Sequence, residues 1–260
     1  MSHGASGEMP FLDHLEELRH RLFWALGALV LAMMVAFAIV WRYDVIGILA
    51  VPIAPYLPDG KLVFTHPADP IGIVLKVSFG LGLVAASPVI VYQAWAFLAP
   101  ALHQHERRVL IPVLIGAAGL FASGVFLCVR FVLPAMFDVL LSFQSASLEQ
   151  MITASEYFSF TVILCLAFGG AFQLPIVILA LTALGLVTPT TLARYRRHAV
   201  VGSLLGAAMI TPGDLLIMTL MLGVPLYGLY EVSIVLSWFV HRAREKRLRA
   251  EADAVGRAAT

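Results

Sequence analysis

Hydrophobic residues occur in six long runs that short polar segments separate. The runs cover residues 23–40, 77–97, 109–129, 157–186, 199–212 and 215–240. A helix crosses the apolar core of a bilayer, about 30 Å thick, with about 20 residues because each residue adds about 1.5 Å. The pattern therefore predicts an all-α membrane protein with six spanning helices. The fifth and sixth are expected to be short, because the uncharged stretches end at Pro212 and just before Glu231.

Apolar side chains also recur at helical spacing ahead of the first run. Phe11, Leu15, Leu18 and Leu22 would form one stripe of a helix. The stripe predicts an amphipathic helix at the cytoplasmic interface. The stretch has early acidic residues and no early basic cluster, so we do not expect a cleavable signal peptide.

Prolines lie inside three of the runs, at Pro88, Pro175 and Pro225. Each removes one backbone hydrogen bond, so bent helices are expected. The loops at 51–58 and 65–70 are also rich in proline, which favours structured caps. We predict a single membrane domain over residues 1–240 and a basic cytoplasmic tail over 241–260.

The basic residues lie mostly on one side of the predicted topology. Segments on the side of the N-terminus hold most of the 17, and the other side has only Arg42, Lys61, Lys76 and Arg130. Short loops rich in Lys and Arg stay in the cytoplasm. Both termini are therefore predicted to be cytoplasmic.

Composition narrows the function classes. The chain is 60% hydrophobic and 13% charged, and its net charge of +1 gives no basic surface for nucleic acid. Cys128 and Cys165 fall inside apolar runs, where we expect them to pack as small apolar side chains. We found no motif for a nucleotide, a catalytic zinc or a nucleophilic serine, and predict no enzyme activity, cofactor or metal.

Lys76, Gln173 and Glu231 are the polar residues that cost most to bury in the membrane. Gln173 lies in the middle of its run, where a helix-to-helix hydrogen bond and a functional contact are both open. The three residues would also fit a path through a secondary transporter. An intramembrane enzyme would need a nucleophile with a base at plausible spacing, and none is evident.

Several segments, in order along the chain, resemble the TatC family. They are HLEELRHR (14–21), YQAWAFLAPAL (92–102), HERR (105–108), FGGAFQLP (168–175) and TPGD (211–214). The resemblance implies a six-helix cup in the cytoplasmic (inner) membrane. It also implies a receptor subunit that binds twin-arginine signal peptides and exports folded cargo, driven by the proton-motive force. The implied partners are TatA- and TatB-type single-span subunits in a homo- or hetero-oligomer, together with membrane lipids.

The resemblance also implies roles for individual residues. Glu17 and Glu106 would face the paired arginines, and Phe97 and Arg19 would shape the same surface. Pro52 would belong to an outer cap, and Asp214 to the outer end of the short helices. From the residues alone, an i,i+4 pair with Arg21 accounts for Glu17, a solvated charge cluster for Glu106, and helix capping for Asp214.

The chain departs from the family at Gln173, where a glutamate is common. An amide still forms hydrogen bonds but does not titrate. Our hypothesis is therefore that Gln173 is a polar contact for a partner helix and takes up no proton.

Overall fold

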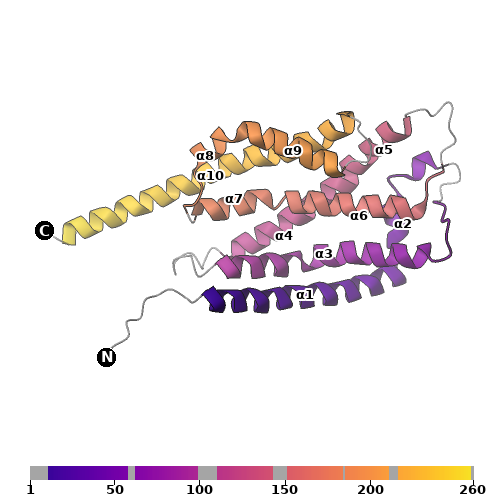
Figure 1. Ribbon diagram of the computed structural model, residues 1–260, viewed down its shortest axis with the longest axis horizontal. Coiled ribbons are helices and arrows are strands. Elements are labelled where there is room, and N and C mark those ends of the chain that lie inside the picture. The colour runs from indigo at the N-terminus through magenta and orange to yellow at the C-terminus, as the bar shows by residue number, and fades with distance from the viewer. Residues whose placement is uncertain are drawn as a thin grey trace.

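The computed structural model describes residues 11–57, 62–98, 110–142, 151–183, 185–210 and 216–258. Helices dominate these residues, and most of them run along the long axis of the molecule (Figure 1). The elements are α1 (Phe11–Arg42), α2 (Val45–Ala50), η1 (Ala54–Tyr56), α3 (Asp69–Leu98), α4 (Leu110–Leu127), η4 (Cys128–Val132), α5 (Leu133–Ser142), α6 (Ala154–Ala171), α7 (Leu174–Ala183), α8 (Pro189–Arg194), α9 (Arg196–Ile210) and α10 (Leu216–Ala258).

Five of the six predicted spans are helical stretches long and apolar enough to cross a bilayer, counted over the described residues. They are His14–Arg42, Asp69–Ala94, Leu114–Ser142, Ala154–Ala183 and Leu216–Lys246. The fifth run forms α9, whose 15 residues extend only about 22 Å at the usual helical rise. A short fifth helix was predicted, and α9 confirms it.

The N-terminal stripe is helical, as predicted. It is continuous with the first span in α1, a single helix of 32 residues, because no glycine or proline interrupts the chain between residues 11 and 26. Leu15 and Leu18 remain 43% exposed, so the rest of the chain does not cover the stripe.

The third helix also runs past its predicted end at residue 129. A π-helical turn, η4, joins α4 to α5 and carries the helix to Ser142. Arg130 does not end the helix because it lies on the surface, with its guanidinium 5.7 Å from the centre of the Phe131 ring.

The fourth helix is interrupted where proline predicts a bend. α6 ends at Ala171 and α7 begins at Leu174. Pro175 has no N–H to donate to the carbonyl of Ala171, so the helical ladder cannot continue unchanged. Pro88 and Pro225 lie inside α3 and α10, and both helices continue past them.

The sixth run is short in its uncharged part, which ends before Glu231 as expected, and its helix continues into the basic tail. α10 has 43 residues and continues past Glu231 and beyond residue 240. The carboxylate of Glu231 lies 2.9 Å from Nε of Arg196 on α9 and accepts a hydrogen bond from Tyr227. These partners compensate the charge, so the helix does not have to end there.

The larger of the two hydrophobic clusters reaches one end of the bundle, which we call the cap end. It comprises α2, η1, α5 and the first turns of α3 and α6. Its hydrophobic cluster includes Ile53, which is fully buried, and Tyr157, which donates a hydrogen bond to the carbonyl of Leu49 over 2.6 Å. The loops here are structured, as their prolines predict.

Tyr56 ties this cap to α5 by donating a hydrogen bond to the Asp138 carboxylate. The same bond raises the pKa of the Tyr56 hydroxyl. A bridge between Val63 and Thr153 joins the loop before α3 to the start of α6. These contacts fix the cap end from several directions.

Cys128 and Cys165 are buried in the same cluster, as predicted for small packing residues. Their sulfur atoms lie 3.6 Å apart as free thiols.

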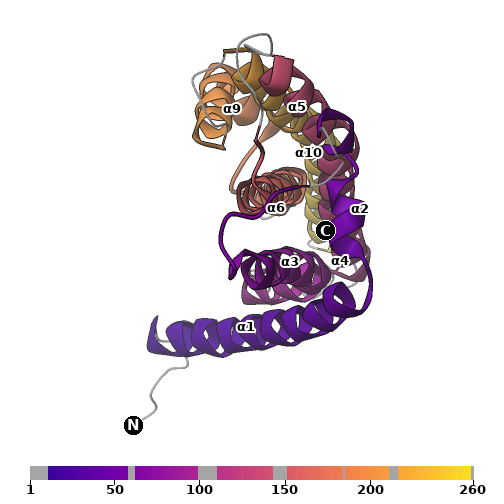
Figure 2. The same cartoon turned by 90° about the vertical axis from the view of Figure 1, so that its right-hand side faces the viewer.

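The opposite end, which we call the His14 end, contains the first turns of α1, the last turns of α3, and α8. Figure 2 shows α1, α3, α6 and α9 following one another along a curve. The hydrophobic cluster nearest this end is small and consists of Ile178, Leu192 and Ile234, with Val187 and Tyr230 against it.

Candidate functional site

A carboxylate lies in the first turns of α1. The guanidinium of Arg21 donates from Nε to Oε1 of Glu17 over 2.9 Å, and Nη2 donates to the same oxygen. This is the i,i+4 pair that the residues alone predicted. The side chain of Glu17 is 24% exposed, so solvent still reaches it.

His14 connects this carboxylate to the end of α3. Its ring stacks on Phe97, with centroids 4.3 Å apart and planes 17° from parallel. Its Nδ1 lies 3.8 Å from Oε2 of Glu17. Because α1 and α3 pack along their length, Glu17 and Phe97 lie on either side of one imidazole.

The two oxygens of Glu17 are therefore not equivalent. Oε1 accepts both bonds from Arg21, whereas Oε2 accepts no hydrogen bond within the described part of the chain. A carboxylate has room for about four hydrogen bonds. Oε2 can consequently accept from a guanidinium outside the chain while Arg21 stays in place.

Arg19 is not brought to this carboxylate. Arg19 lies two positions after Glu17, which corresponds to a rotation of about 200° around the helix. Its guanidinium lies 5.6 Å from the centre of the exposed Phe23 ring. Glu106 and Asp214, the other charged residues that the resemblance implies, lie outside the described residues.

Gln173 lies at the break between α6 and α7. Its Nε2 donates to the carbonyl of Ala117 on α4 over 2.9 Å, so the helix-to-helix hydrogen bond exists. Its Oε1 is buried and has no hydrogen-bond partner among the described residues. Within the described part of the chain, one half of the amide thus holds α4 and the other half has no donor.

The remaining polar candidates have separate partners. Lys76 contacts α6, and Glu231 contacts α9. With Gln173 bonded to α4, these contacts do not join the three residues into the path that a transporter would need. Pro52 follows α2 and is half-buried beside Ile53, within the cap end.

A family model described as "Sec-independent protein translocase protein (TatC)" matches residues 13–225. The chain belongs to the TatC family. Two crystal structures titled as the twin-arginine translocase receptor TatC, one of them in DDM, superpose on this chain with TM-scores of 0.77 and 0.78. Both are 36% identical, covering 87% and 86% of this chain and 99% of theirs. The likeness confirms the six-helix cup.

Relatives in other bacteria support the same assignment. The TatC protein of Deinococcus radiodurans is 40% identical over 88% of this chain and 85% of its own length. That of Aquifex aeolicus is 37% identical over 93% of this chain and 100% of its own. The Escherichia coli K12 protein is 32% identical over 88% of each. Their names describe translocase components and indicate no enzyme activity.

Sequence reasoning missed the contacts of His14 with Phe97 and Glu17. The spacing of His14 from Glu17 places both on one helical face. Its stacking partner, Phe97, lies on another helix, so no local pattern predicts the pair.

Proposed function

We propose that this chain, as the core subunit of a twin-arginine translocase, binds the paired arginines of signal peptides at the His14 end, with Glu17 as one of two carboxylates. The observation that carries the proposal is Oε2 of Glu17, which accepts no hydrogen bond within the described residues and lies 3.8 Å from His14, beside its stack on Phe97. Phe97 offers an apolar face next to the charge.

The chemistry accounts for a preference for arginine over lysine. A guanidinium presents a planar fork of donors and binds a carboxylate through two parallel bonds, whereas an ammonium acts as a point charge. Glu106 supplies the second carboxylate in this proposal, so that each arginine has its own acceptor. Arg19 faces away from Glu17 and in this proposal contributes net charge but no direct contact.

Charge placement supports a cytoplasmic location for the His14 end. Arg194 and Arg196 lie on α8 and α9 near this end, and Arg242 and Arg244 follow the last apolar turn of α10. Basic residues gather on the cytoplasmic side of membrane proteins. Both termini would then be cytoplasmic, in the inner membrane, where the signal peptide is first presented.

A partner helix would complete the hydrogen bonding of Gln173, whose Oε1 has no donor among the described residues. Single-span subunits of the TatA and TatB type would bring a polar side chain or a hydroxyl to Oε1 at the helix break, while Nε2 stays bonded to Ala117. The oxygen does not titrate, so coupling to the proton-motive force uses other groups. A Gln173→Leu variant that exports cargo at the wild-type rate would exclude this contact.

Binding of two peptides to the protein in nanodiscs tests the receptor proposal. One carries Arg-Arg and the other Lys-Lys at the same positions. We expect tight binding of the first only, and a loss of about tenfold or more in both Glu17→Ala and Glu106→Ala, because a charge-assisted hydrogen bond contributes about 1.5–3 kcal/mol.

Glu16→Ala is the matched control, because Glu16 is exposed on the same helical turn and forms no ion pair within the described residues. It removes the same charge without removing the acceptor. Equal affinity for the two peptides, or equal losses in Glu16→Ala and Glu17→Ala, would rule the mechanism out.

A further inference from the structure

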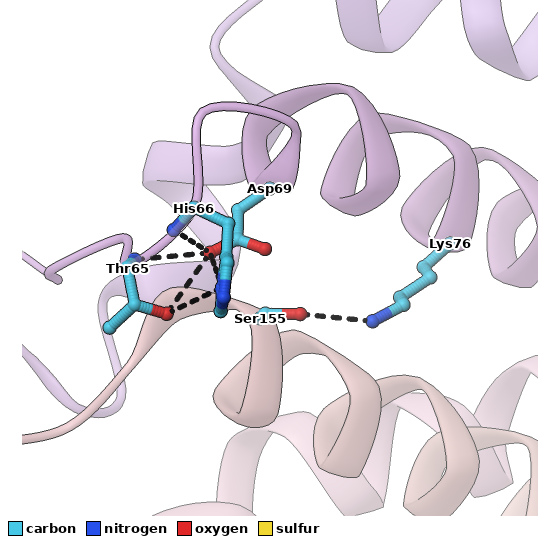
Figure 3. A network of polar contacts seen from close by, with 5 residues as sticks. All are labelled: Thr65, His66, Asp69, Lys76 and Ser155. Carbon is cyan, nitrogen blue, oxygen red and sulfur yellow. Dashed lines mark hydrogen bonds and ion pairs between the residues drawn. The ribbon is translucent and has the colours of Figure 1, made fainter.

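Lys76 projects from α3 toward the start of α6 at the cap end. Its Nζ donates to the hydroxyl of Ser155 over 3.1 Å and to that of Ser159 over 2.7 Å. Figure 3 shows the side chain extended toward Ser155. Both partners are neutral, so they orient the ammonium and leave its charge uncompensated.

The carboxylate on the same helix is engaged elsewhere. Asp69 accepts from the backbone N–H groups of Thr65, at 3.1 Å, and His66, at 2.9 Å. Figure 3 shows one of its oxygens bonded to that loop and no contact drawn between Asp69 and Lys76. On α6, Glu156 is exposed beside Ser155 but makes no ion pair with Lys76, which has no salt bridge at all within the described residues.

The hydrogen-bond donors of Lys76 and the two serines outnumber the acceptors that the described residues offer them. An ammonium has three N–H donors and Lys76 uses two. Ser159 donates its own hydrogen to the carbonyl of Ser155 over 2.6 Å, whereas the hydroxyl of Ser155 has no acceptor in the described part of the chain. One N–H of Lys76 and the O–H of Ser155 are therefore left, side by side, for an anionic oxygen.

The site lies near the cap-end limit of two candidate membrane spans, Asp69–Ala94 and Ala154–Ala183. Lys76 follows the start of α3 by about 10 Å along the helix axis, and Ser155 and Ser159 lie in the first two turns of α6. A lysine near the end of a span reaches toward the interface, where phosphate groups lie.

We propose that Lys76, Ser155 and Ser159 bind the phosphate group of an anionic phospholipid. The surroundings favour a lipid over a free anion. Leu75 and Phe79 flank Lys76 on α3, Ile163 follows Ser159 by one turn on α6, and all three are exposed apolar side chains. They offer a surface for acyl chains next to the charge.

The proposal is tested by titrating the detergent-purified protein with lipids and counting bound molecules by native mass spectrometry. Phosphatidylglycerol is expected to bind more tightly than phosphatidylcholine. Lys76→Gln should lower the affinity for phosphatidylglycerol about fivefold. This is the equivalent of the roughly 1 kcal/mol that one lysine contributes near a charged membrane surface. Ser155→Ala should lower this affinity less, and Lys76→Arg should retain it.

Arg42→Gln is the matched control, because it removes another exposed cation, at the end of α1. Equal losses in Arg42→Gln and Lys76→Gln would mean general electrostatic attraction and overturn the site. Unchanged binding in a folded Lys76→Gln variant would also overturn it, as would displacement of the lipid by millimolar inorganic phosphate, which would indicate a free-anion site. If a partner's carboxylate were the true occupant, the purified protein would not distinguish the two lipids.

Discussion

The two ends of the helix bundle are built differently. At the cap end, a large hydrophobic cluster surrounds fully buried residues such as Ile53 and Leu133, and hydrogen bonds tie the loops to the helices. At the His14 end the neighbouring cluster is small, and polar side chains such as Glu17 remain partly exposed.

The difference suggests that the cap end stabilises the fold and that the His14 end is left for binding. Close packing at one end holds the helices in a fixed arrangement, because densely packed interiors resist deformation. The other end can then leave a carboxylate oxygen without a hydrogen-bond donor among the described residues, since it does not have to stabilise the fold. Four predictions test this comparison.

The largest expected effect is a loss of packing at the cap end. Leu133→Ala removes a fully buried side chain from the large cluster, and we expect it to lower the free energy of unfolding by about 2–5 kcal/mol. Leu192→Ala in the small cluster should cost less than half as much, because fewer buried neighbours lose contacts. Unfolding in detergent measures both, and equal losses would contradict the comparison.

The backbone should matter more than packing at the His14 end. Gly185 has a φ of +76°, in the turn between α7 and α8, and an added Cβ would collide with the guanidinium of Arg244. Gly185→Ala should therefore lower stability by about 1–2 kcal/mol, the usual penalty for the left-handed conformation. Gly202→Ala, in open space within α9, is the control and should not destabilise the protein.

A smaller effect is expected for a single hydrogen bond of the cap end. Tyr157→Phe removes the bond to the carbonyl of Leu49 and should cost about 1 kcal/mol, because the carbonyl loses its partner in a buried environment. Tyr56→Phe should cost close to nothing, because its bond to Asp138 is exposed and water replaces it. Thermal unfolding of the two variants compares them; a larger cost at Tyr56 would mean that the loop, not the core, stabilises this end.

The smallest effect is expected for Arg21, which competes with a bound peptide for the carboxylate of Glu17. Arg21→Gln removes an i,i+4 pair of about 0.3–0.5 kcal/mol. Affinity for the Arg-Arg peptide should rise about twofold, because Oε1 is released. The peptide titration described above measures it, with stability as a control. A loss of arginine selectivity would instead make Arg21 part of the recognition surface.

Much of the fold follows from local pattern. The six apolar runs, the short fifth helix and the break near Pro175 could be predicted because burial in lipid and the missing proline N–H act on the residues themselves. Helix ends were less predictable. Arg130 was read as the limit of the third run, and Glu231 as the limit of the uncharged part of the sixth. A charged side chain does not end a helix when it reaches the surface or finds a partner such as Arg196.

The sequence by itself determined the membrane class, the family and the i,i+4 pair of Glu17 with Arg21, since each depends on spacing or on contiguous motifs. Only the tertiary structure decided the stacking of His14 on Phe97, the different surroundings of the two Glu17 oxygens, the bond from Gln173 to Ala117, and the meeting of Lys76 with Ser155 and Ser159. These contacts join residues on helices far apart in the chain. Their geometry depends on how the helices pack, which no local pattern encodes.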